Sequence, residues 1–169
     1  MRLSFGFQFA PGKSYDCHDR GMSMAQWDDL RNKLRQSQEE AAEATKRSNQ
    51  EHDIVRLQQG GLWSELAKQF FEAVTIINTG QTVLNFSQPP TNSNALRVSV
   101  PRGGSNPPAA NVTFNENGHE VMVAYSGIQA PVLKYTIRAN SSNRTEFSNR
   151  GGQAVDPKDI VNETISHLA

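Results

Sequence analysis

The chain has 169 residues, enough for one domain with a tail or an appended helix but not for two full domains. Its 17 Lys and Arg residues balance 17 Asp and Glu residues, and the two signs also balance on either side of residue 80. This distribution argues against a general nucleic-acid or anionic-membrane binder, which needs an excess of positive charge. We therefore expect neither a nucleic-acid nor a membrane partner, although a small local basic patch remains an open alternative.

The cysteine count and the hydropathy pattern limit the cellular setting. Cys17 is the only cysteine, so an internal disulfide and a cysteine-based zinc site are both excluded. The chain contains no run of 18 apolar residues, so we expect no transmembrane helix. The first residues are a poor signal peptide, because Gly6 and Gln8 break a short apolar stretch. We expect a soluble, cytoplasmic protein that holds no cofactor and no metal.

Large apolar residues are concentrated in the second part of the chain. Residues 1–61 are polar, whereas residues 62–169 contain most of the Val, Ile, Leu, Phe and Tyr. This asymmetry predicts a disordered tail over residues 1–22, a polar N-terminal helix over residues 23–59 and a compact α+β domain over residues 62–169.

The polar helix has apolar residues at one end only. Ser23 is a suitable cap, and Trp27, Leu30 and Leu34 follow at helical spacing. Residues 35–53 then favour a helix but include no large apolar residue. Such a helix cannot bury an apolar stripe, so it is solvated, frayed or bound to something outside this chain. Trp27, Leu30 and Leu34 accordingly have two interpretations, core residues or anchors for a partner.

A second helix is expected after Gly60-Gly61, because each glycine costs about 1 kcal/mol in a helix interior. It spans residues 62–78 and ends at Asn78-Thr79-Gly80, where the glycine can adopt a left-handed conformation. Its apolar face consists of Leu62, Trp63, Leu66, Phe70, Ala73, Val74 and Ile77.

Alternating apolar residues beyond this helix predict strands. The candidate strands are residues 82–86, 95–100, 111–115, 120–125, 132–139 and 144–148. Asn117-Gly118 predicts a two-residue hairpin turn of type I′, and residues 140–143 predict a second, softer hairpin turn. Short connections of this kind make the sheet antiparallel.

Each predicted strand has one apolar face, so the sheet should be covered on one side only. Asp156 and Pro157 begin a last short helix, as N-cap and first helical residue. The expected fold is therefore α+β. It is a two-layer sandwich, with an antiparallel meander of about five or six strands covered on one face by amphipathic helices, plus the N-terminal polar helix.

The sequence contains no convincing catalytic group. Residues 6–14 suggest a phosphate-binding loop, but five residues separate the two glycines instead of four, and no good helix start follows. Cys17-His18-Asp19 lies in the predicted tail, where nothing would hold a catalytic geometry. His52, His119 and His167 look isolated, with His119 expected as an exposed turn residue. We assign no catalytic residue and lean against an enzyme.

Two non-catalytic functions remain, with an enzyme of unnamed reaction third. The leading hypothesis is a protein-interaction domain that contacts an unknown partner, or a second copy of itself, through Trp27, Leu30 and Leu34. The alternative is a small apolar ligand bound in a cavity under the helices. That cavity would be lined by Trp63, Phe70, Phe114, Tyr125 and Tyr135, which otherwise fill the core.

Overall fold

The computed structural model describes residues 24–81, 83–88, 94–101 and 106–169. The predicted tail, the segment from residue 6 to 14 and the Cys17-His18-Asp19 triplet all lie outside the described residues. The chain divides into two units, with the boundary between Ala42 and Glu43.

One helix, α1 (Met24–Ile77), replaces the two helices that the sequence predicts. The interruption expected at Gly60-Gly61 is therefore wrong. Gln59 and Trp63 flank the glycines and are both buried, while the glycines themselves are exposed and face open space. Packing on either side of the pair thus outweighs the intrinsic cost of two glycines in a helix.

The C-terminal half of α1 provides the helical side of the core. Its buried residues recur at helical spacing and are Val55, Gln59, Trp63, Leu66, Ala67, Phe70 and Val74. Gly80 follows the helix with a φ of 89°, as expected for a glycine that ends a helix. The Asn78 side chain then accepts hydrogen bonds from the backbone N–H groups of Val83 and Leu84, each at 2.8 Å. These bonds fix the turn from α1 into the sheet.

Within the described residues, seven strands form one antiparallel sheet in which each strand pairs with the next along the chain. They are β1 (Asn85–Ser87), β2 (Ala95–Ser99), β3 (Ala109–Asn115), β4 (Glu120–Ser126), β5 (Leu133–Ala139), β6 (Thr145–Ser148) and β7 (Ala154–Val155). This confirms the predicted α+β class and the antiparallel meander. The sheet has one strand more than the upper estimate, because β7 is only two residues long and too short to show a period.

The alternation of apolar and polar residues places one face of the sheet in the core. Val112 and Phe114 of β3 are buried, and they pair with Val123 and Val121 of β4. The opposite face is polar and includes an ion pair between Lys134 Nζ and Glu120 Oε1 at 2.7 Å.

The turn between β3 and β4 differs from the predicted two-residue hairpin. Four residues, 116–119, connect Asn115 to its partner Glu120. The positive φ falls on His119, at 51°, and not on Asn117 or Gly118. The Asn115 side chain explains the difference, because its Oδ1 atom accepts a hydrogen bond from Gly118 N at 3.1 Å and so closes a longer turn. The second predicted hairpin turn, at residues 140–143, is present.

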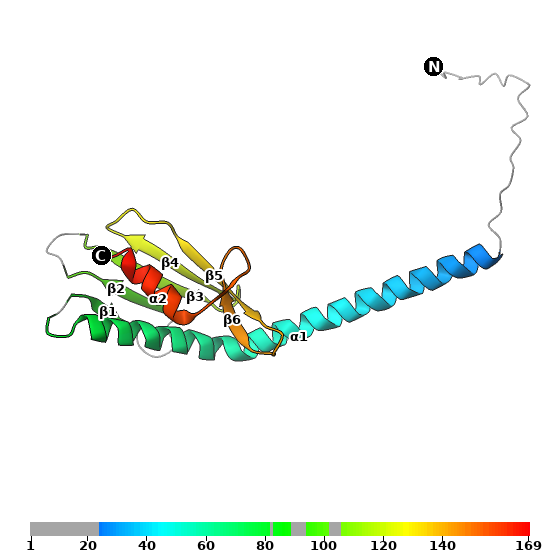
Figure 1. The fold of residues 1–169 in the computed structure, drawn as a ribbon, viewed down its shortest axis with the longest axis horizontal. Coiled ribbons are helices and arrows are strands. Elements are labelled where there is room, and N and C mark those ends of the chain that lie inside the picture. The colour runs from blue at the N-terminus through cyan, green and yellow to red at the C-terminus, as the bar shows by residue number, and fades with distance from the viewer. Residues whose placement is uncertain (1–23, 82, 89–93, 102–105) are drawn as a thin grey trace, which may run out of the picture. The chain divides into compact units, whose positions relative to one another are not determined.

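The final helix, α2 (Pro157–Ser166), covers the apolar face of the sheet together with the C-terminal half of α1 (Figure 1). Asp156 caps it, since its Oδ1 atom accepts a hydrogen bond from Lys158 N at 2.8 Å. Ile160 and Val161 are buried in the core. Neither described helix has an apolar stretch long enough to cross a bilayer.

Candidate protein-interaction site

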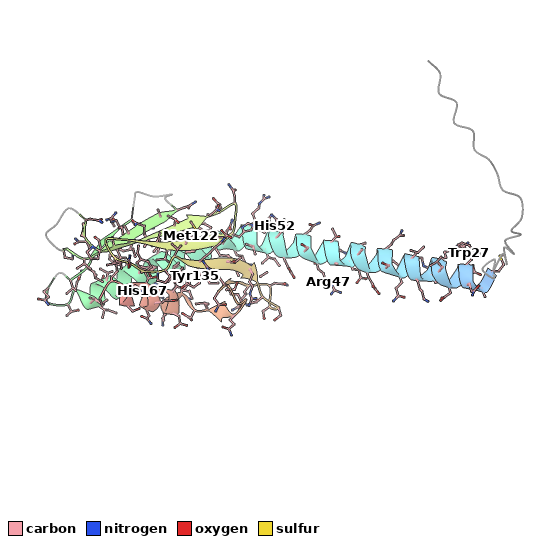
Figure 2. The ribbon with its side chains drawn as sticks, turned by 90° about the horizontal axis from the view of Figure 1, so that it is seen from above. Trp27, Arg47, His52, Met122, Tyr135 and His167 are labelled. Atoms are coloured by element: carbon pink, nitrogen blue, oxygen red, sulfur yellow. The ribbon has the colours of Figure 1, made fainter. Side chains whose placement is uncertain are left out.

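The N-terminal part of α1 exposes large apolar side chains to solvent. Every residue from 24 to 42 is exposed, including Met24 (83%), Trp27 (52%), Leu30 (37%) and Leu34 (57%). The spacing from Met24 to Trp27, Leu30 and Leu34 is three, three and four residues, so the four side chains share one side of the helix. We call this surface the Trp27 face; Figure 2 labels Trp27 on α1.

A hollow of about 530 Å³ lies on the Trp27 face. Its lining combines the four apolar side chains with a polar rim, and the residues are Met24, Trp27, Asp28, Leu30, Arg31, Leu34, Arg35 and Gln38. An apolar centre with charged residues around it is the usual layout of a protein-binding surface.

Most charged side chains beside the Trp27 face form ion pairs within the helix. Arg31 pairs with Asp28 at 3.5 Å, and Lys33 Nζ lies 2.8 Å from Asp29 Oδ2. The hydrogen bond to Asp29 and the negative charge of that carboxylate raise the pKa of the Lys33 amine. Each exposed pair of this spacing contributes little to stability by itself, because water and salt screen the charges. Together the pairs support a helix in a segment that buries no apolar residue against the described chain.

The structure brings together the three partner-binding residues that the sequence predicts, Trp27, Leu30 and Leu34. It adds Met24, which sequence reasoning missed. The three-residue spacing between Met24 and Trp27 was the available signal.

The five aromatic residues of the predicted ligand cavity lie in the second unit. Trp63, Phe70, Phe114 and Tyr135 are buried members of one hydrophobic core, and Tyr125 packs against it half-buried. Trp63 stacks on Phe114 with ring centroids 5.6 Å apart. Tyr135 also lines a surface hollow of about 490 Å³.

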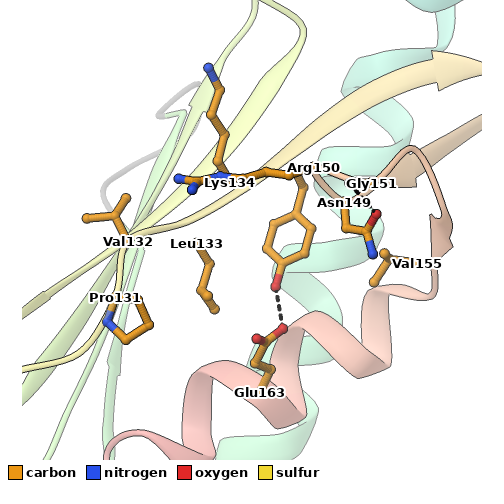
Figure 3. A pocket seen from close by; sticks show the side chains of 10 residues that line it. Pro131, Val132, Leu133, Lys134, Asn149, Arg150, Gly151, Val155 and Glu163 are labelled. Atoms are coloured by element: carbon orange, nitrogen blue, oxygen red, sulfur yellow. Dashed lines mark hydrogen bonds between the residues drawn. The ribbon is translucent and has the colours of Figure 1, made fainter.

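Two residues that line this second hollow, one on β5 and one on α2, form a hydrogen bond with each other (Figure 3). The Tyr135 hydroxyl donates to Glu163 Oε2 at 2.7 Å. Burial, and then the adjacent Glu163 carboxylate, raise the pKa of the Tyr135 hydroxyl above its ordinary value. The hydroxyl therefore stays protonated at neutral pH and serves as a donor that joins a strand to a helix.

His52, Gln59 and His119 form a polar cluster that the sequence did not predict. His119 Nδ1 lies 2.7 Å from Gln59 Oε1, and His119 Nε2 lies 3.3 Å from His52 Nδ1. An amide oxygen only accepts, so Nδ1 of His119 holds the proton. The expectation that His52 and His119 are isolated is wrong, because the unbroken α1 places His52 and Gln59 beneath the β3–β4 turn. His167, at the C-cap of α2, packs edge-on against Tyr125.

No three His, Cys, Asp or Glu side chains among the described residues are grouped closely enough to hold a metal ion. Comparison of the chain with protein-family models, with curated proteins and with solved structures found no match.

Proposed function

We propose that this chain is a non-catalytic protein-interaction module and that the Trp27 face is its contact surface. The observation that carries the proposal is the exposure of Trp27, half of whose side chain faces solvent beside three other large apolar residues. Tryptophan is among the residues that contribute most to binding when an interface covers them. A cluster of this kind on an otherwise polar segment of a helix is typical of a surface that another polypeptide covers.

The spacing on the Trp27 face suits recognition by a helix or a groove. Trp27, Leu30 and Leu34 occupy positions i, i+3 and i+7, the pattern of a helix that inserts apolar anchors into a partner. Burial of the exposed parts of these three side chains would release roughly 2–5 kcal/mol before the cost of association. A stable complex therefore needs further contacts from the residues around them.

Site-specific photo-crosslinking tests the proposal in a native extract of the source cells. A benzophenone amino acid is placed at Arg31, which lines the hollow on the Trp27 face, and in a matched chain at Asn32. Asn32 is the next residue, about 100° around the helix from Arg31, and points away from the Trp27 face. We expect a discrete crosslinked band from position 31 and none from position 32.

A third chain has the probe at position 31 together with the substitutions Trp27→Ala and Leu34→Ala. The band should disappear from this chain if the apolar side chains hold the partner. Equal labelling at positions 31 and 32, or no band from either position, would contradict the proposed function.

A further inference from the structure

The apolar spacing of the Trp27 face continues along α1 as a seven-residue repeat. With Trp27 as position a, the a and d positions are Trp27, Leu30, Leu34, Ser37, Ala41 and Ala44. All six are exposed. Ten charged residues lie between residues 24 and 47, yet none occupies an a or d position. We call these six positions the seam. A seven-residue repeat with large apolar residues at one end and small uncharged residues at the other lets two helices approach closely and pair.

The side chains of the seam are large at its N-terminal end and small at its C-terminal end. Its first three residues are Trp27, Leu30 and Leu34, and its last three are serine and alanine. An antiparallel pair of such helices places each large side chain opposite a small one. The layers are Trp27 with Ala44, Leu30 with Ala41, and Leu34 with Ser37, each occurring twice by symmetry. A parallel pair would instead stack large on large and small on small, which leaves gaps at one end.

The charges beside the seam favour the same orientation. Lys33 and Glu40 both occupy position g. In an antiparallel pair, position g of one helix lies beside position g of the other, so Lys33 faces Glu40 twice. A parallel pair sets position g against position e, which places Lys33 beside Gln38 and forms no ion pair there.

We propose that the partner of the Trp27 face is a second copy of this chain, bound antiparallel through residues 24–47. The two-fold axis passes between residues 35 and 36. This inference rests on the proposed function and names its partner. One segment contains both the large side chains and the small positions that receive them, and both signs of charge at the matching places.

Sedimentation equilibrium of the purified full-length chain tests for the dimer. We expect the mass to rise with concentration from 18.7 kDa towards twice that value. Trp27→Ala should weaken the dimer about 100-fold, because the residue occurs twice in the interface. Leu57→Ala is the matched control, since Leu57 is exposed on the same helix (82%) but lies outside the seam, and it should leave the equilibrium unchanged.

Charge reversal tests the pairing of Lys33 with Glu40. Lys33→Glu and Glu40→Lys should each weaken the dimer about 10-fold, and the double variant should recover most of the loss. The helical content of each dilute variant, measured by circular dichroism, separates this effect from the ion pair that Lys33 makes with Asp29 in its own helix.

Spin labels determine the orientation directly. In a Cys17→Ser background, a single cysteine is introduced at Ala25 or at Asn32, both at position f of the repeat. An antiparallel dimer separates the two Ala25 positions by about 32 Å along the axis and the two Asn32 positions by about 10 Å. The electron–electron distance should therefore be longer for Ala25 by at least about 10 Å, and equal distances would overturn the antiparallel pairing.

A chain that stays monomeric, while the probe at position 31 still captures a different protein, would overturn the self-association and leave the proposed function standing.

Discussion

Two tryptophans in one helix have opposite environments. Trp63 is only 6% exposed and stacks on Phe114 in the core, whereas Trp27 is 52% exposed. Both residues lie within α1, so helix propensity does not distinguish them. The two rings differ in their contacts: Trp63 packs in the core, whereas Trp27 is exposed, and this exposure is the basis of the binding role proposed for Trp27.

Alanine substitution should separate these two roles. Trp63→Ala removes a buried ring and should lower the free energy of unfolding by about 3–5 kcal/mol. Trp27→Ala should change it by less than about 0.5 kcal/mol in dilute solution, because the ring buries little surface there. Urea unfolding followed by circular dichroism measures both values. A loss of several kcal/mol from Trp27→Ala would show that Trp27 belongs to the core.

Tyr135 provides a pH-dependent test at the residue scale. Its hydroxyl donates to Glu163, and its pKa in the folded protein is raised above the unfolded value of about 10. Tyr135→Phe should cost about 1 kcal/mol at neutral pH. The contribution of the hydroxyl is fully present below pH 10 and is lost as the pH rises further, because only the unfolded chain then releases the proton.

The stability of the wild-type chain should therefore fall more steeply above pH 10 than that of Tyr135→Phe. Urea unfolding at a series of alkaline pH values tests this expectation. Parallel slopes for the two proteins would contradict the role given to the Tyr135 hydroxyl.

At the scale of the element, the unbroken course of α1 depends on packing rather than on propensity. Gly60 and Gly61 sit in the helix interior, and a Cβ added at either would meet no atom within 4 Å. Gly60→Ala and Gly61→Ala should each stabilise the protein by about 0.5–1 kcal/mol.

Gly80→Ala is the matched control for these two substitutions. Its φ of 89° strains any residue with a Cβ, so this variant should lose about 1 kcal/mol. Thermal unfolding compares the three variants. A destabilised Gly60→Ala would show that the chain needs a glycine at that point of the helix.

The sequence predicts well the elements that follow from a burial pattern, and poorly those that depend on a specific contact. The strands of the meander follow from the alternation of residues such as Leu96 and Val98 around Arg97, because burial of one face imposes a period of two. The turn at Asn117-Gly118 and the break at Gly60-Gly61 were mispredicted. In each case a contact decided the outcome, the Asn115 side chain in the turn and the flanking core residues in the helix.

The candidate site was predictable in part. The spacing of Trp27, Leu30 and Leu34 identified an apolar helix face, but sequence alone left open whether that face is core or contact surface. Their exposure is a property of the folded chain. The cluster of His52, Gln59 and His119 was out of reach, because residues far apart in sequence meet there only once α1 runs unbroken past the β3–β4 turn.

At the scale of the whole molecule, the two units differ in what they bury. The unit from Glu43 to Ala169 contains a core that joins α2, seven strands and the C-terminal half of α1. The described part of the other unit, residues 24–42, is a helix whose residues are all exposed. This division separates the part that folds around its own apolar residues from the part that leaves large apolar residues exposed.

The most direct test of the interaction function is the sedimentation velocity of the fluorescently labelled full-length chain in a native extract. The wild-type chain should sediment as an assembly larger than 18.7 kDa, and the variant with Trp27→Ala and Leu34→Ala should sediment as the single chain. If the wild type also sediments as a single chain, or if both proteins sediment as the same larger assembly, the Trp27 face is not the contact surface.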